Sequence, residues 1–252
     1  MFFVELRFVV VLFFMQIFNT IETMRAASRA ARHIGKRVGF VPTMGALHEG
    51  HLSLVRAAKA QSDVVAASIF VNPTQFGPNE DFYKYPRTFE RDCELFTKER
   101  VELLFAPAVE EMYPVGAMTY VTVEGISERL CGKSRPGHFR GVTTVVSKLF
   151  NIVEPDVAFF GQKDAAQAAI IRRMVRDLNI PVEISVCPIV READGLAMSS
   201  RNTYLDPQQR KAALTLHHSL QEVKHRFESG ERNVAQLIEY GLKCSRKNHR
   251  CD

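Results

Sequence analysis

Residues 38–51 read VGFVPTMGALHEGH, and this stretch decides the fold because it joins a strand to a helix through a tight turn. Its opening apolar run, VGFV, predicts a buried strand. Pro42–Gly50 has the composition of a turn, in which Gly45 and Gly50 are free to adopt positive φ. His51 then opens the segment HLSLVRAAKA, whose apolar residues fall at helical spacing: Leu52, Leu54, Val55 and Ala58.

A strand, a tight turn and a helix N-terminus, in this order, build a site for an anion. The first backbone N–H groups of the helix and its dipole converge on any phosphate that binds there. His48 and His51 add two imidazoles to the same place. A lone histidine is usually structural or solvated, but two of them in one glycine-rich junction favour a functional site.

The composition is ordinary for a soluble enzyme with one large domain or two smaller ones. The chain has 252 residues, of which 46% are hydrophobic and 24% charged. The net charge is +5 and the isoelectric point is near 9.0. Lys and Arg are scattered, apart from Arg172–Arg173 and the tail KCSRKNHR. The basic balance therefore favours an anionic small substrate and predicts no nucleic-acid partner.

The cysteines predict a reducing compartment. There are five of them, an odd number, and the sequence contains no C-x-x-C pair. A chain without a disulfide framework is typical of the cytoplasm. The histidines are not spaced with the cysteines as a zinc site requires. We therefore expect a cytoplasmic protein without zinc.

The first residues, MFFVELRFVVVLFFMQIF, are apolar but predict no membrane segment. A membrane-spanning helix needs roughly 20 apolar residues, and here Glu5 and Arg7 interrupt a shorter run. A signal peptide would begin with basic residues. We expect residues 1–14 to be an N-terminal extension without a role, in preference to an export signal or a degenerate organelle-targeting segment.

Strand-like and helix-like segments alternate along the chain, which predicts an α/β fold with a doubly wound parallel sheet. Ligands of such sheets lie beyond the strand C-termini. An apolar helix is expected from Gly141, and another starts at Asp206–Pro207 with Asp as its N-cap. Further strands are expected in SDVVAASIFVNP (62–73), LLFAP (103–107), YVTVEG (120–125), DVAFFG (156–161) and IPVEISVCPIV (180–190).

The histidine element resembles a known nucleotide-binding signature. His-x-Gly-His, residues 48–51, resembles the ATP-binding motif of the nucleotidyltransferases that are similar to class I aminoacyl-tRNA synthetases. The longer PTMGALHEGH, residues 42–51, resembles one family among them, the pantothenate synthetases, which join pantoate to β-alanine using ATP. The resemblance runs from about Met15 to Glu239 and implies an extension (1–14), a Rossmann-like domain for ATP and pantoate (15–190) and a C-terminal lid domain (191–252).

The resemblance implies a reaction in two steps. The pantoate carboxylate attacks the α-phosphate of ATP, which is bound with Mg²⁺, to give pantoyl adenylate and pyrophosphate. The amine of β-alanine then attacks the activated acyl carbon and releases AMP with pantothenate. Adenylation is needed because a carboxylate is a poor electrophile and AMP is a good leaving group. An enclosed site protects the intermediate from water.

Three segments of the resemblance imply contacts with ATP. His51 would be the proton donor, and His48 and Lys163 would act with it on the charge that builds at the phosphates. Arg201 in MSSR would be the cation of a mobile loop over the β- and γ-phosphates. The implied ATP-binding residues are Met44, Gly45, Ala46, Leu47, His48, Glu49, Gly50, His51, Gly161, Gln162, Lys163, Asp164, Val190, Met198, Ser199, Ser200 and Arg201.

Two glutamines are the implied substrate-binding residues. Gln75 and Gln167 would meet pantoate from opposite sides, because a glutamine binds a carboxylate or a hydroxyl without competing charge. We assign no protein metal ligand: Asp92 is set aside because Arg91 and Leu95 beside it are unsuitable neighbours for magnesium. A structural or interface role is favoured for three residues of SRPGHFRGV, namely Arg135, His138 and Arg140.

The family implies a homodimer formed through the first domain, with no membrane partner. Its second domain continues further, whereas this sequence stops after the first one or two helices of that domain. We therefore expect an incomplete lid that closes poorly, so that nucleotide binds while overall turnover is low.

Two other functions stay open. A related adenylyltransferase would share His-x-Gly-His but would not need the glutamines of VNPTQF and GQKDAAQ. A truncated, weakly active or non-catalytic remnant would bind nucleotide or a partner subunit. A pyrophosphate-release assay with and without pantoate separates these functions.

Overall fold

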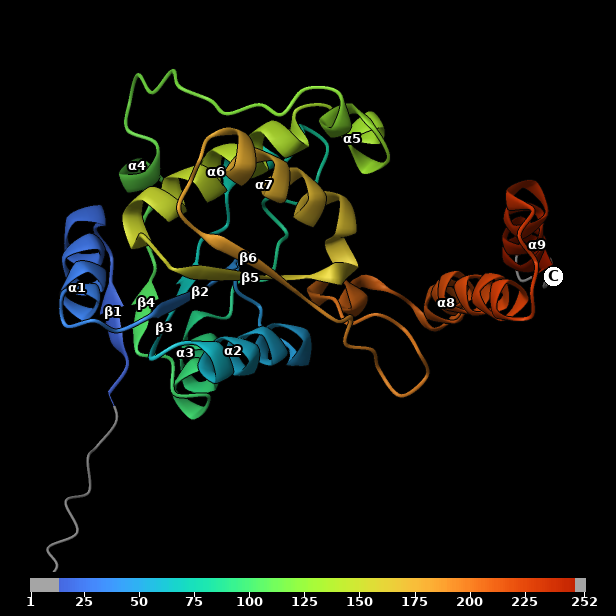
Figure 1. The fold of residues 1–252 in the computed structure, drawn as a ribbon, viewed down its shortest axis with the longest axis horizontal. Helices are drawn as coiled ribbons and strands as arrows, with labels where there is room; N and C mark the ends of the chain where they lie inside the picture. Colours follow the sequence, from blue (N-terminus) through green and yellow to red (C-terminus); the bar gives the residue numbers. More distant parts are fainter. Residues whose placement is uncertain (1–13, 248–252) are drawn as a thin grey trace, which may run out of the picture.

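The computed structural model describes residues 14–247, in which six strands form one parallel sheet (Figure 1). The strand order is β1-β4-β3-β2-β5-β6. The predicted α/β fold with a parallel sheet is confirmed, and all but one of the predicted strands are present. The strands are β1 (Gln16–Phe18), β2 (Val38–Thr43), β3 (Val64–Ile69), β4 (Leu103–Phe105), β5 (Val157–Gly161) and β6 (Glu183–Cys187).

The strand order reverses at β2, and this reversal places the site. From β2 the chain builds β3 and β4 on one side, with β1 beyond them, and then crosses to place β5 and β6 on the other side. Val38 of β2 is paired with Val64 of β3, and Gly39 of β2 is paired with Val157 of β5. The connections after β2 and β5 diverge at this switch point, which leaves a crevice at the C-terminal ends of the two strands.

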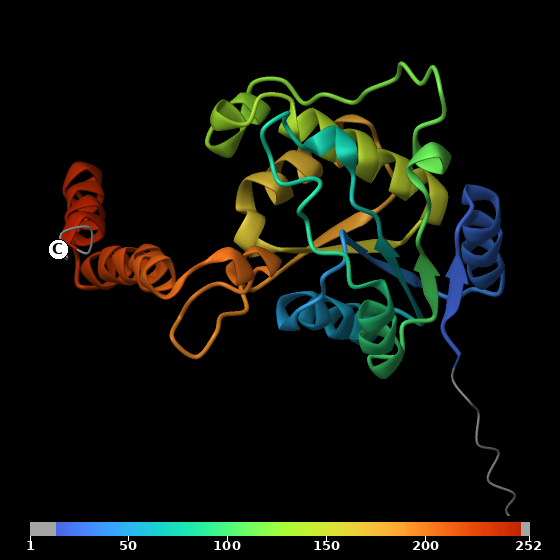
Figure 2. The same cartoon turned by 180° about the vertical axis from the view of Figure 1, so that it is seen from behind.

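Helices cover both faces of the sheet, as the prediction of a doubly wound fold requires (Figures 1 and 2). Successive residues of β2 face opposite sides: Phe40 packs in the core under α6 and α7, and Val41 packs in the core under α2 and α3. Burial on both faces explains why the strands read as continuous apolar runs. One face carries α1 (Ile21–His33), α6 (His138–Val153) and α7 (Ala165–Asp177), and the other carries α2 (Glu49–Gln61) and α3 (Phe89–Lys98).

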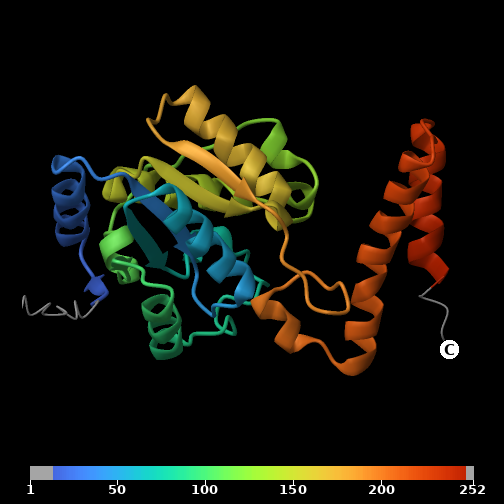
Figure 3. The same ribbon diagram turned by 60° about the horizontal axis from the view of Figure 1, so that its bottom comes forward.

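The last two helices, α8 (Pro207–Glu228) and α9 (Val234–Lys247), pack against each other and project away from the sheet (Figures 1 and 3). The predicted start of α8 is confirmed, because the Asp206 carboxylate accepts a 2.8 Å hydrogen bond from Gln209 N and the Gln209 side chain accepts one from Asp206 N. Several apolar side chains of these helices are exposed, including Leu216, Leu220 and Ile238.

The strand predicted at YVTVEG, residues 120–125, is wrong. The segment runs along α6, and threonine side chains of that helix bind its backbone: Val121 N donates to Thr144 Oγ1 over 3.0 Å, and Thr143 Oγ1 donates to the carbonyl of Val121 over 2.6 Å. Because side chains satisfy these polar groups, the apolar residues pack on the helix without a neighbouring strand.

Two helices begin earlier than predicted. Helix α2 begins at Glu49, with His48 as its N-cap, and α6 begins at His138 after Gly137, whose φ is +82°. The remaining elements are short: α4 (Val109–Met112), α5 (Cys131–Ser134), η1 (Pro73–Gln75), η2 (Ile126–Glu128), η3 (Gln162–Asp164) and η4 (Ser200–Tyr204).

The predicted N-terminal extension, residues 1–14, lies outside the described residues apart from Phe14. Between Phe14 and Lys247 the structure holds no helix that combines the length and the apolar character needed to cross a membrane.

Candidate active site

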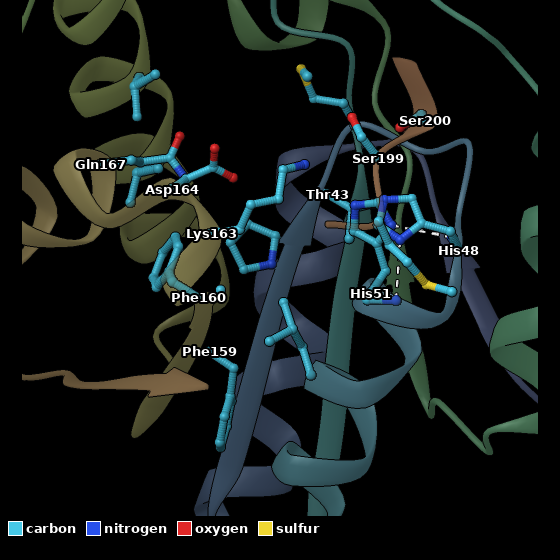
Figure 4. A pocket seen from close by; sticks show the side chains of 18 of the residues that line it. Thr43, His48, His51, Phe159, Phe160, Lys163, Asp164, Gln167, Ser199 and Ser200 are labelled. Atoms are coloured by element: carbon cyan, nitrogen blue, oxygen red, sulfur yellow. Dashed lines mark hydrogen bonds between the residues drawn. The ribbon is translucent and has the colours of Figure 1, made fainter. Parts of the chain in front are cut away.

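A pocket opens at the C-terminal ends of β2 and β5, at the predicted position (Figure 4). Five segments supply much of its lining: the β2–α2 turn (Thr43, Met44, His48, Gly50, His51), the segment after β3 (Asn72, Gln75), α6 (Val142, Val145, Val146, Leu149), the β5–α7 junction (Gly161, Lys163, Asp164, Gln167) and the segment after β6 (Val190, Met198, Ser199, Ser200, Arg201).

The β2–α2 turn is held by a buried carboxylate. Gly45 and Ala46 both have positive φ, of 81° and 50°. Asp92 of α3, only 1% exposed, accepts hydrogen bonds from Ala46 N over 2.9 Å and from Leu47 N over 2.8 Å. A side chain at Gly45 would meet this carboxylate, since an added Cβ would lie 2.9 Å from Asp92 Oδ2. Asp92 therefore fixes the left-handed turn that leads into the histidines.

Imidazole nitrogens cap the first turn of α2. His48 Nδ1 accepts a hydrogen bond from Gly50 N over 3.1 Å, and His51 Nδ1 accepts one from His48 N over 3.3 Å. This arrangement explains the glycine of the motif, because a Cβ on Gly50 would lie 2.8 Å from Cε1 of the His48 ring. It also explains the early start of the helix, since the two capped N–H groups belong to the N-cap, His48, and to the second helical residue, Gly50.

The same bonds set the protonation of both rings. Because each Nδ1 accepts an N–H group, a neutral imidazole here carries its proton on Nε2. The two ring centroids are 4.1 Å apart. His48 and His51 therefore present two N–H donors to the pocket that they line.

Both histidines are held in the neutral form. Burial first, and then the nearby His48 and Lys163, together lower the pKa of His51 to about 3. Burial, and then Lys163, also lowers the pKa of His48. At pH 7 His51 is thus a neutral hydrogen-bond donor. A proton-donating role for His51 needs an anion in the pocket, because negative charge raises the pKa of an imidazole.

The opposite wall repeats the strand, turn and helix of the first. Strand β5 ends at Gly161, η3 follows, and α7 begins at Ala165, as predicted for GQKD. In Figure 4 Asp164 and Gln167 lie on this wall, His48, His51, Ser199 and Ser200 lie on the other, and Lys163 extends between the two. The structure thus brings together the two predicted phosphate-binding segments.

A third wall combines a glutamine with the apolar face of α6. Gln75 Nε2 donates to Met44 Sδ over 3.1 Å, and Asn72 donates to Gln75 Oε1 over 3.1 Å. Helix α6 approaches this segment closely because Gly141 has no side chain: an added Cβ would lie 2.3 Å from the carbonyl oxygen of Thr74. The wall therefore offers both polar and apolar surface to a small ligand.

The MSSR loop closes the remaining side. Met198 N donates to the carbonyl of Val190 over 3.0 Å, and the hydroxyls of Ser200 and Tyr85 lie 3.4 Å apart. Arg201 lines the pocket while its guanidinium is paired with Asp81. Residues 198–201 thus line the pocket, and their predicted role as a cover over the phosphates stays a prediction.

Some predicted residues do not line the pocket. The side chain of Leu47 is buried in the core, that of Glu49 is paired with Arg56, and Gln162 is exposed. Gly45 and Ala46 form the turn behind the histidines. None of these five residues lines the pocket, and their predicted roles stay predictions.

Other lining residues were missed by sequence analysis. Tyr85 and the apolar residues of α6 line the pocket, and Tyr85 lies in a turn-rich segment without a recognisable pattern. Asn72, by contrast, was not missed: its position directly after a strand predicts a place near the site, and it lines the pocket, buried beside Gln75. Among residues 14–247 no group of three or more His, Cys, Asp or Glu residues has an arrangement that could hold a metal ion.

The chain is similar to pantothenate synthetases over most of its length. The family model described as pantoate-beta-alanine ligase matches residues 16–250. A pantothenate synthetase of Moorella thermoacetica is 64% identical over 221 residues, which are 88% of this chain and 78% of that protein. One from Thermotoga neapolitana is 61% identical over 225 residues, which are 89% and 80% of the two chains.

Solved structures are similar as well. The pantothenate synthetase of Thermus thermophilus matches with a TM-score of 0.87 and 49% identity, over 92% of this chain and 83% of that chain. A pantoate-beta-alanine ligase from Francisella tularensis, solved in complex with beta-gamma ATP and beta-alanine, matches with a TM-score of 0.79 and 36% identity, over 92% and 86% of the two chains.

The pKa of His51 predicts how acid affects stability. Unfolded His51 takes up a proton below its ordinary value of 6.5, whereas folded His51 does so only near pH 3, so the free energy of unfolding falls as the pH falls through this window. In urea unfolding, the decrease in the free energy of unfolding from pH 7 to pH 5 should be smaller for His51→Asn than for the wild type, by up to about 2 kcal/mol. His218→Asn, at an exposed position, is the control and should keep the wild-type loss. Equal losses in all three proteins would contradict the assignment.

Proposed function

The chain belongs to the pantoate–β-alanine ligase family, and we propose how its residues divide the reaction among them. This ligase uses ATP to form a C–N bond between pantoate and β-alanine. The observation that carries the proposal is the pair of neutral imidazoles at the start of α2, which face Lys163 across one pocket.

ATP is proposed to bind with its phosphates at the N-terminus of α2. The Nε2–H groups of His48 and His51 donate to the α-phosphate and the bridging oxygen, and Lys163 supplies a positive charge from the opposite wall. The backbone of Val190 holds the adenosine, and Ser199, Ser200 and Arg201 cover the β- and γ-phosphates. The positions of these groups around one pocket support this arrangement.

Pantoate is proposed to bind between Gln75 and Gln167, against the apolar face of α6. Its carboxylate attacks the α-phosphate, and the negative charge that builds there and on the departing pyrophosphate is stabilised by His48, His51 and Lys163. Phosphate charge beside His51 raises the pKa of its imidazole, which lets it share a proton with the leaving group. The neutral resting state of the ring leaves its N–H free for this contact.

The second step needs little from the protein beyond enclosure. The amine of β-alanine attacks the acyl carbon of pantoyl adenylate, the C–N bond forms, AMP leaves with the electrons of the acyl–oxygen bond, and the phosphate of AMP takes up the proton that the nitrogen loses. The 198–201 loop excludes water from the intermediate.

Magnesium is proposed to arrive with the triphosphate as part of the substrate. The phosphate oxygens are its preferred ligands. Asp92, whose carboxylate holds the turn before the histidines, already accepts hydrogen bonds from two backbone N–H groups and from Thr88 Oγ1.

We also propose a division of the chain and its assembly. Residues 15–190 form the ATP- and pantoate-binding domain, and residues 191–252 belong to a lid domain. The protein is proposed to be a cytoplasmic homodimer that joins through the first domain. Exposed apolar side chains between α4 and α6 support this interface: Val115, Met118, Tyr120 and Leu130.

Pyrophosphate release tests the function. Wild-type protein should release pyrophosphate from ATP only when pantoate is present. His51→Ala should lower the rate by ~10²–10³, because one preorganised donor to the reacting phosphate is lost. The far-ultraviolet circular dichroism of this variant should match the wild type. Pantoate-independent release would favour a related adenylyltransferase, and a folded variant with the wild-type rate would refute the role of His51.

Ligand binding tests the two halves of the site. Lys163→Ala should weaken the binding of ATP more than that of pantoate, because a phosphate loses its charged partner. Gln167→Ala should do the reverse. Calorimetric titration of both variants with each ligand gives the comparison, and loss of the same ligand in both would show the division to be wrong.

Light scattering tests the assembly. At micromolar concentration the protein should have the mass of two chains, and Met118→Glu should shift it toward one chain by placing a charge among the exposed apolar residues. A wild-type monomer under these conditions would count against the dimer.

A further inference from the structure

The loop between η1 and α3 holds two neighbouring carboxylates that face different parts of the pocket wall. Glu80 binds Arg135, with 2.7 Å between Glu80 Oε1 and Arg135 Nε. Asp81 binds Arg201, with 2.8 Å from Oδ2 to Nε and 2.9 Å from Oδ1 to Nη2. Each carboxylate meets its arginine with both oxygens, which fixes the plane of the guanidinium as well as its position.

The pair with Asp81 leaves part of Arg201 available to a ligand. The carboxylate occupies the edge formed by Nε and Nη2, and the guanidinium carbon lies 5.3 Å from the centre of the Tyr85 ring. Within the described chain no hydrogen bond from Nη1 of Arg201 is formed, and the residue lines the pocket. The hydrogen bond with Arg201 lowers the pKa of Asp81, so both partners stay charged at neutral pH.

The pair of Glu80 with Arg135 is connected by hydrogen bonds to Gln75, on the other half of the pocket. Arg135 Nη1 lies 3.1 Å from His138 Nε2, and His138 Nδ1 lies 2.8 Å from the carbonyl oxygen of Gln75. Because an arginine only donates, His138 Nε2 is the acceptor, and its Nδ1–H donates to Gln75. Burial lowers the pKa of His138, which agrees with this neutral form. Glu80 therefore reaches the backbone of Gln75 through two side chains.

We propose that Glu80 and Asp81 are positioning residues for opposite halves of the site. Asp81 acts through Arg201 on the β- and γ-phosphates of ATP, and Glu80 acts through Arg135 and His138 on Gln75 and pantoate. The inference rests on the proposed roles of Arg201 and Gln75. Its physical basis is that long side chains and loops bind a ligand well only when neighbouring groups have already restricted them.

A purely structural role for the loop makes a different prediction. Glu80 and Asp81 are adjacent, so a general loosening of the loop would affect both ligands in both variants. Positioning through separate arginines would instead weaken the binding of only one ligand in each variant, and a different ligand in the two variants. The two neighbouring residues are therefore controls for each other.

The experiment uses the near-isosteric variants Asp81→Asn and Glu80→Gln. Calorimetry gives the affinity for a non-hydrolysable ATP analogue, and pyrophosphate release gives KM for pantoate. Asp81→Asn should weaken binding of the analogue about tenfold and change KM for pantoate little, and Glu80→Gln should do the reverse. Asp177→Asn removes a surface carboxylate that pairs with Arg173 on α7, and it should leave both constants unchanged. Parallel loss of both ligands in both variants would overturn the proposal.

A double-mutant cycle separates this proposal from the assignment on which it rests. Once Arg201→Ala has been introduced, adding Asp81→Asn should weaken binding of the analogue no further. If Arg201→Ala alone leaves the analogue bound normally, the phosphate role of Arg201 fails. If Arg201→Ala weakens binding and Asp81→Asn does not, only the positioning role fails.

Thermal unfolding of each variant guards against misfolding. Should Asp81→Asn not fold, Asp81→Glu keeps the charge but moves the carboxylate by one methylene group, and it should still weaken binding of the analogue. A folded Asp81→Glu variant with wild-type affinity would overturn the proposal.

Discussion

The structure depends on two imidazole nitrogens that cap the first turn of α2. His48 Nδ1 and His51 Nδ1 accept backbone N–H groups that otherwise have no partner at a helix start. The same bonds leave each Nε2–H free for a ligand. These two hydrogen bonds therefore cap the helix start and also orient two donors toward the pocket. Gly50 makes room for the His48 ring, and Asp92 holds the turn that leads into it.

The sheet supplies the second half of the chemistry through its topology. Strands β2 and β5 are neighbours although the chain between them builds β3, β4 and α6. Lys163 therefore faces the histidines from a separate strand–turn–helix unit. Helix α6 passes over the same edge, and it approaches Thr74 and Gln75 closely because Gly141 has no side chain. Each wall of the pocket thus follows from a local sequence feature that the parallel sheet brings to one place.

Local patterns predicted most of the fold and the main site. Strands buried on both faces give apolar runs such as VGFV, and short-range chemistry sets the turn at residues 42–51 and the cap at Asp206. The failures come from contacts distant in sequence. YVTVEG alternates like a strand, but threonines of α6 satisfy its backbone. The neutral state of His51 comes from burial in the fold, and the Asp81–Arg201 pair joins segments far apart in the sequence.

The central claim is that both histidines meet the nucleotide as neutral Nε2–H donors. Nuclear magnetic resonance of protein labelled with nitrogen-15 in histidine tests this claim directly, because the two ring nitrogens differ in chemical shift between tautomers. At pH 7 the rings of His48 and His51 should each carry one proton, on Nε2, and His51 should remain uncharged at pH 5. A doubly protonated His51 at pH 7, or a proton on Nδ1 of either ring, would contradict the account.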